Sequence, residues 1–164
     1  MRYVLKQQLL SWEDDFFIRS DHDHDVFFVD GKSLRAGDQL SFQDLTGREL
    51  AYVKQKVFAR GRTFEIYRNG MIEAVVKEQL FTLQDYHFTV EKPRKKDLEA
   101  RGDFPGREYT FQRGERVVAT VSKTDMKGTD TYGVEIPDGE DDVYILAAAV
   151  VIDELASTKR RART

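Results

Sequence analysis

The sequence contains no cysteine among its 164 residues. This absence excludes disulfide bonds, thiolate nucleophiles and zinc sites with cysteine ligands, and it suits the reducing cytosol. The segment Met1–Gln8 lacks the apolar run of a signal peptide. The longest apolar run, Val143–Ile152, has ten residues, whereas a membrane-spanning helix needs ~20. We therefore expect a cytoplasmic protein without a spanning helix.

An excess of positive charge is also missing. The chain has 26 lysines and arginines against 29 acidic residues, a formal net charge of −3, so we expect no nucleic-acid partner. With 3 prolines and 11 glycines the chain is neither collagen-like nor of low complexity, and its 40% apolar residues suffice for a packed core. The length predicts a single domain, residues 1–158, followed by a basic disordered tail, residues 159–164.

Most of the chain consists of short segments in which apolar and polar residues alternate, the pattern typical of β-strands. Asn69-Gly70 lies between two such segments and predicts a tight hairpin, because both residues accept positive φ. Arg113-Gly114 predicts a second hairpin of the same kind. We expect about twelve strands between Arg2 and Ile136.

A weak internal repeat accompanies these strands. Three segments resemble one another: Val4–Leu10, Tyr52–Phe58 and Val75–Phe81. The resemblance favours a repeated meander of hairpins. The alternative is that all strands with one solvent-facing side share such a pattern.

The C-terminal part breaks the strand pattern. Acidic residues in Pro137–Asp142 are typical of a helix start, where they complement the positive end of the helix dipole. The following apolar run has no polar residue on any helical face, so the helix must be buried on all sides. We expect a helix from about Glu140 to about Ala156. Its buried core comprises Val143, Ile145, Leu146, Ala147, Ala148, Ala149, Val150, Val151 and Ile152.

Many antiparallel strands and one wholly apolar helix fit one architecture. About eight strands close into a barrel that side chains alone can fill, whereas about twelve leave a wider lumen. A helix ~10–12 Å across can plug that lumen. The sequence therefore predicts a mainly β protein, a closed antiparallel β-barrel of about twelve strands around a central buried C-terminal hydrophobic helix.

Six segments spread over nearly the whole chain point to a family. They are Tyr3–Gln7, Phe28–Lys32, Glu49–Lys56, Gly102–Phe104, Asp130–Ile136 and Leu146–Asp153. In these segments the sequence resembles the LURP-one-related family, a branch of the tubby C-terminal-like superfamily, in its bacterial-type form. One departure is Pro105-Gly106-Arg107, which stands where family members often carry a tryptophan and acidic residues.

The resemblance implies a twelve-stranded barrel around a central C-terminal helix, in agreement with the residue pattern. It implies less about function. Tubby proteins bind phosphoinositide headgroups, and phospholipid scramblases are thought to share the fold, but no residue of the tubby lipid site matches here. None of the matching segments is a catalytic motif.

The segment Asp21–Asp25, of sequence Asp-His-Asp-His-Asp, places five metal-ligand side chains in succession. A calcium loop of the EF-hand type is excluded, because Val26 stands where glycine is needed and Lys32 where glutamate is needed. We interpret the segment as a solvated turn. The alternative is a metal-dependent hydrolase or metalloprotein that uses this segment.

The sequence offers no catalytic motif. It contains no Gly-x-Ser-x-Gly, no glycine pattern of a dinucleotide fold and no P-loop. Apart from the two histidines of residues 21–25, only His87 is present, on an expected strand. We expect no catalytic residue, no cofactor and no bound metal.

Two clusters of cations are candidates for contact with an anion or a lipid headgroup. They are Lys92, Arg94, Lys95 and Lys96 in an expected loop, and Lys159, Arg160, Arg161 and Arg163 in the tail. The alternative for the first cluster is a solvated loop without a ligand. The alternative for the tail is a set of cations that complement the negative end of the helix dipole. We therefore expect a non-enzymatic binding or scaffold domain whose partner is an anionic membrane surface, contacted peripherally, or another protein.

Overall fold

The computed structural model describes all residues except 7–14, 32–38, 57–61, 81–85, 124–130 and 164. The described chain forms twelve strands and one helix. They are β1 (Arg2–Lys6), β2 (Phe16–Ser20), β3 (Asp25–Asp30), β4 (Gln39–Asp44), β5 (Glu49–Gln55), β6 (Thr63–Arg68), β7 (Met71–Leu80), β8 (Tyr86–Lys92), β9 (Lys95–Asp103), β10 (Glu108–Arg113), β11 (Arg116–Lys123), β12 (Thr131–Glu135) and α1 (Asp142–Arg163).

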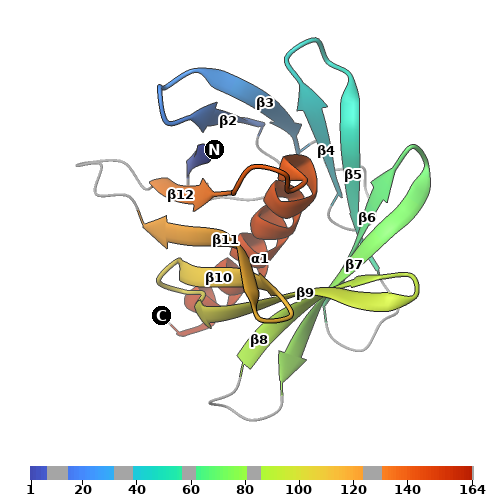
Figure 1. The fold of residues 1–164 in the computed structure, drawn as a ribbon, viewed down its shortest axis with the longest axis vertical. Helices are drawn as coiled ribbons and strands as arrows, with labels where there is room; N and C mark the ends of the chain where they lie inside the picture. The colour runs from blue at the N-terminus through green and yellow to red at the C-terminus, as the bar shows by residue number, and fades with distance from the viewer. Residues whose placement is uncertain (7–14, 32–38, 57–61, 81–85, 124–130, 164) are drawn as a thin grey trace.

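The strands close into an antiparallel barrel. Each strand pairs with its neighbours in sequence, and β1 pairs with β12 to complete the ring. Figure 1 shows α1 passing through the middle of this ring. The prediction of a closed barrel of about twelve strands around a C-terminal helix is confirmed.

Alternation of strand direction gives the barrel two different ends. Five short turns, which join β2–β3, β4–β5, β6–β7, β8–β9 and β10–β11, lie at the end where α1 begins, here called the tight-turn end. The other connections lie at the opposite end. Among them, the β9–β10 loop, residues 104–107, is described in full. Asn69 and Gly70 form the β6–β7 turn with φ of 49° and 75°, as predicted. The β10–β11 turn lies one residue later than predicted, at Gly114-Glu115.

All five tight hairpins share one irregularity, a β-bulge close to the turn. In each hairpin the extra residue is on the second strand. The extra residues are Val26, Leu50, Glu73, Asp97 and Val118. Bulges bend and twist a strand and are common at barrel rims, so this regular set supplies the curvature that closes the ring.

The bulges account for two of the three copies of the internal repeat. The copies that start at Tyr52 and Val75 each begin two residues after a bulge, on the second strand of a hairpin. The residues just before them, Ala51 and Ala74, are buried, and a small inward side chain at this position leaves room for the helix. The copy that starts at Val4 begins in β1, and its residues 7–10 lie outside the described part of the chain.

The predicted helix core is buried with one exception. Residues 145–152 are all buried, with Val150 the most exposed at 7%, whereas Val143 is only partly buried because it lies in the first turn, near the barrel rim. Tyr144, which the apolar pattern did not assign to the core, is also buried. The helix approaches β5 and β6 most closely. Three successive alanines, 147–149, reduce the side-chain bulk around the middle of the helix and so allow the surrounding strands to lie close.

The helix starts and ends later than predicted. It begins at Asp142 and continues to Arg163, so the backbone of residues 159–163, which we expected to be disordered, is helical. Lysine, arginine and alanine are good helix formers, and cations near a helix C-terminus interact favourably with its dipole. No helix in the described part of the chain is long and apolar enough to cross a membrane.

Polar contacts fix the start of the helix at the tight-turn end. The Asp141 side chain accepts a hydrogen bond from the Tyr144 amide at 3.2 Å, as an N-cap residue does. The same carboxylate pairs with Arg68 at 2.6 Å. The Tyr3 hydroxyl donates to Asp142. These contacts tie the helix start to β1 and to the β6–β7 hairpin.

A second group of charges closes the same end. The Arg113 guanidinium donates two hydrogen bonds to Asp97, at 3.0 and 3.2 Å, and one to Glu140 at 2.7 Å. Arg116 also donates to Glu140 at 2.7 Å. The Asp97 side chain is only 4% exposed. Burial raises the pKa of Asp97, but the bonds and charge of Arg113 outweigh that effect, so its pKa lies below the ordinary value of 3.8.

The central position of the helix predicts the effect of Ala148→Asp. The new carboxyl would replace a fully buried methyl group and would have no polar partner, at a cost of several kcal/mol. A domain of this size is stable by only ~5–15 kcal/mol, so we expect an unfolded or insoluble product. Val117→Asp, at an exposed site on β11, is the matched control and should leave the denaturant midpoint nearly unchanged. A stable, fully folded Ala148→Asp protein would contradict the central-helix architecture.

The Asp97–Arg113 contact predicts a pH-dependent loss of stability in Asp97→Asn. Because the folded-state pKa of Asp97 is lowered, the ionised carboxylate raises the free energy of unfolding. This stabilisation is fully present above the unfolded-state pKa of ~3.9 and is lost as the pH falls through the folded-state pKa. Urea denaturation should show Asp97→Asn less stable by about 1–3 kcal/mol at pH 7. The difference should shrink below pH ~4. The exposed Asp138→Asn serves as control; a pH-independent deficit in Asp97→Asn would refute the role of this charge.

Candidate functional site

Within the segment Asp21–Asp25, residues 21–24 form the turn between β2 and β3, and Asp25 is the first residue of β3. The carboxylates of this segment are engaged by a neighbouring cation, since Arg19 donates to Asp23 at 3.0 Å and to Asp25 at 2.9 Å. The His22 side chain is 81% exposed. Among the residues that the structure describes, no three His, Cys, Asp or Glu side chains gather as a metal site would require. The metalloprotein alternative is therefore not favoured.

The four cations near residue 94 lie at the tight β8–β9 turn, and two of them have partners. The Lys92 amino group lies over the Tyr144 ring, 5.1 Å from its centroid, and Lys96 pairs with Glu99. Arg94 and Lys95 are exposed. The cluster therefore presents two outward cations instead of four convergent ones.

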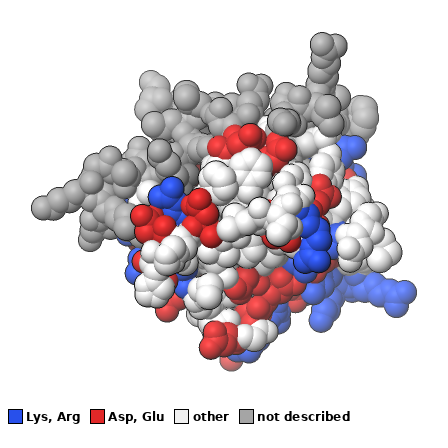
Figure 2. Space-filling view, turned by 90° about the horizontal axis from the view of Figure 1, so that it is seen from above, with Lys and Arg blue, Asp and Glu red and all other residues white. Residues whose placement is uncertain are grey.

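The basic C-terminal segment lies far from that turn. The Lys92 contact with Tyr144 places the β8–β9 turn beside the first turn of α1. The cations 159–163 belong to the last turns of the same 22-residue helix, which at 1.5 Å per residue is ~33 Å long. The backbone of the two basic segments thus lies toward opposite ends of the helix. On the face shown in Figure 2, acidic and basic side chains are interspersed.

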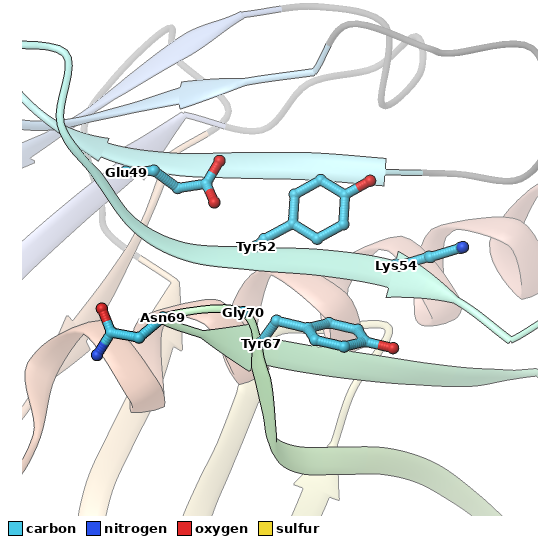
Figure 3. A pocket seen from close by; sticks show the side chains of 6 residues that line it. All are labelled: Glu49, Tyr52, Lys54, Tyr67, Asn69 and Gly70. Carbon is cyan, nitrogen blue, oxygen red and sulfur yellow. The ribbon is translucent and has the colours of Figure 1, made fainter.

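A cleft lies on the outside of β5 and β6. Its volume is about 310 Å³, and it is lined by Glu49, Tyr52, Lys54, Tyr67, Asn69 and Gly70. Tyr52 and Tyr67 are direct cross-strand neighbours, and their ring centroids are 6.2 Å apart with an angle of 59° between the planes. Figure 3 shows the two rings side by side, with the Glu49 carboxylate on one side of Tyr52 and the Lys54 side chain on the other.

Hydrogen bonds hold the polar groups of this cleft in place. The Tyr52 hydroxyl donates to Gln39, and the Tyr67 hydroxyl donates to Glu65 at 3.3 Å. Burial and the charge of Glu49 raise the pKa of Tyr52. Burial, the charge of Glu65 and its hydrogen bond raise the pKa of Tyr67. Both hydroxyls therefore stay protonated near neutral pH, and the cleft presents ordered, neutral aromatic rings.

An apolar surface adjoins the cleft on β7. Ile72 is the cross-strand partner of Tyr67 and is 41% exposed, and its neighbour Met71 is 72% exposed. Tyr52, Tyr67 and Ile72 thus form a row across the outer faces of three strands. Sequence reasoning missed this row, because the pairing of β5 with β6 is not encoded in either segment alone. The signal that was available is the occurrence of a tyrosine at an outward position of each strand.

The segment Gly102–Arg107 has a structural role at the other end of the barrel. A side chain at Gly102 would lie 2.5 Å from the carbonyl oxygen of Glu108, so only glycine fits. Phe104 is buried between aromatic rings, 4.7 Å from Phe88. Arg107 forms a 2.7 Å ion pair with Asp153 of α1. This ion pair links the β9–β10 loop to the helix.

Comparisons with known proteins agree with this architecture. A family model described as LURP-one-related matches residues 1–153. The uncharacterised protein YxjI of Bacillus subtilis (strain 168) is 28% identical over 153 residues, which cover 91% of this chain and 90% of that protein. The X-ray structure of a protein from Arabidopsis thaliana superposes with a TM-score of 0.68 at 16% identity, covering 94% of this chain and 90% of that one, and so shares the fold. The chain belongs to the LURP-one-related family, as its sequence motifs indicated.

Proposed function

We propose that this chain is a non-enzymatic binding domain that recognises a protein partner through the outside of its barrel. The observation that carries the proposal is the cleft between Tyr52 and Tyr67, which is continuous with the exposed Ile72. Aromatic residues and methionine are enriched at the cores of protein interfaces, and exposed apolar patches commonly mark such interfaces. We name the row Tyr52, Tyr67 and Ile72 the β5–β7 face.

The position of this face supports a recognition role. The inner side of β5 and β6 packs closest to α1, with Val53 and Ile66 fully buried. Because the helix occupies the lumen, a partner has access to the outer side only. A binding surface on well-packed strands is held in a fixed shape, which lowers the entropic cost of association.

The alternative occupant, an anionic lipid headgroup, has weaker support. Arg94 and Lys95 are the outward cations of the β8–β9 turn, and each would contribute ~1 kcal/mol at an anionic surface. The backbone of the tail cations lies toward the far end of α1, away from this turn. Two cations would therefore contribute about 2 kcal/mol. A dissociation constant of 1 mM corresponds to a binding free energy of about 4 kcal/mol, so this attraction is too weak to reach millimolar affinity.

A catalytic role for the cleft also has little support. Its two hydroxyls have raised pKa values and are bonded to Gln39 and Glu65. A nucleophile needs a base within hydrogen-bond reach, and the residues lining the cleft include no histidine. Binding is the function that this arrangement can perform.

Site-specific photocrosslinking tests the proposal. With p-benzoylphenylalanine in place of Ile72, irradiation of cells of the source organism should give one discrete adduct, identifiable by mass spectrometry as a polypeptide. The same reagent in place of Val117, which is equally exposed on β11, is the matched control and should give none. Adding Tyr52→Ala and Tyr67→Ala should abolish the adduct at position 72. Equal adducts at both positions, or none at 72, would refute the β5–β7 face as the binding surface.

A liposome experiment distinguishes the lipid alternative. We expect no cosedimentation of the purified protein with anionic liposomes at physiological salt, since surface charges separated by more than ~8 Å are screened there. Strong cosedimentation that is lost in Arg94→Ala/Lys95→Ala would assign the binding role to the β8–β9 turn and overturn the proposal.

A further inference from the structure

The arrangement of the two tyrosine rings fits a cationic group. A cation interacts with an aromatic face at up to ~6 Å from the ring centroid. Since the centroids of Tyr52 and Tyr67 are 6.2 Å apart and the planes are inclined by 59°, a cation above the cleft can lie within that range of both. The cleft volume of about 310 Å³ is large enough for the end of one side chain.

Carboxylates border both rings. Glu49 accepts a hydrogen bond from the Ser41 hydroxyl at 2.8 Å, and Glu65 accepts one from Tyr67. Each carboxylate is close enough to its tyrosine to raise the pKa of the phenol. Within the described part of the chain, neither Glu49 nor Glu65 forms an ion pair with lysine or arginine. Two negative charges therefore accompany the aromatic pair.

One cation of the chain itself lines the cleft. Lys54 is the cross-strand neighbour of Glu65, but Figure 3 shows its amino group extended along β5, away from the Tyr52 and Tyr67 rings. The positive charge of Lys54 offsets the negative charge of its cross-strand neighbour Glu65. The carboxylate of Glu49, on the other side of Tyr52, then supplies the net negative charge of the cleft (Figure 3).

We infer that the cleft between Tyr52 and Tyr67 accepts an arginine side chain of the protein partner, with the guanidinium over the rings and beside Glu49. This inference rests on the proposed function and specifies the partner's chemistry. Arginine fits best, because its planar guanidinium stacks on aromatic rings and also donates paired hydrogen bonds to a carboxylate. The exposed Ile72 would contact an apolar residue next to that arginine.

The test uses a small probe and does not require the partner. The ¹⁵N-labelled full chain is titrated with N-acetyl-argininamide and, separately, with N-acetyl-citrullinamide, a neutral analogue of the same shape. We expect amide shifts confined to residues 49–54 and 65–72 that approach saturation at millimolar argininamide. Citrullinamide should bind about fivefold to tenfold more weakly, because it lacks the cation–π and charge contributions.

Variants separate the contributions. Tyr52→Ala should abolish the saturable shifts, whereas Tyr52→Phe, which keeps the ring, should retain them. Glu49→Gln should weaken argininamide but not citrullinamide. Glu115→Gln makes the same change of charge on the exposed β10–β11 turn, and it should leave both titrations unchanged. Well-dispersed amide spectra would show that every variant is folded.

Three results would overturn the inference: equal binding of the two probes, shifts spread evenly over acidic residues of the whole surface, or retention of binding in Tyr52→Ala. If this titration fails while the crosslink at position 72 succeeds, the face binds a partner without an arginine in the cleft. If the titration succeeds and the crosslink fails, the cleft binds guanidinium groups but the β5–β7 face is not a protein interface.

Discussion

The burial of α1 on every side is the constraint on which the rest of the structure depends. A helix with residues 145–152 apolar and buried all round needs a complete wall of apolar side chains. The wall is complete only when β1 pairs with β12, which joins the two ends of the barrel sequence, for example Arg2 with Glu135. The helix follows β12 directly, so ring closure and helix burial depend on each other. A barrel without its helix would leave a wide apolar lumen open to water.

The two ends of the barrel meet this constraint in different ways. At the tight-turn end, bulges place Glu73 and Asp97 where their side chains pair with Arg68 and Arg113 close to the helix start. Burying such charges is costly, and the cost is offset only when each charge has several partners, as Arg113 has. At the opposite end, Arg107 fastens the β9–β10 loop to Asp153. Ion pairs thus lie on either side of the wholly apolar segment 145–152 of the helix.

The fold could be predicted because its signals are local. Alternation identifies strands, Asn69-Gly70 identifies a turn, and an apolar run without a polar face identifies a central helix. The end of the helix was misjudged because the residues after Ala156 have no apolar pattern, so the sequence signals for a longer helix are helix propensity and charge near its C-terminus. The cleft could not be predicted, because it depends on which outward residue of β5 lies opposite which residue of β6. That register is set by closure of the whole ring.

Because the helix fills the lumen, the fold and the proposed recognition use opposite sides of the same strands. On β5 the inward Val53 is buried against the core, whereas Tyr52 next to it faces outward; on β6 Ile66 and Tyr67 divide in the same way. A cross-strand aromatic pair contributes only about 0.5–1.5 kcal/mol to stability beyond its area, which is small against the burial of the inner residues. Outward residues can therefore change with little effect on folding, so a barrel of this kind can keep its core pattern while the surface that meets a partner varies.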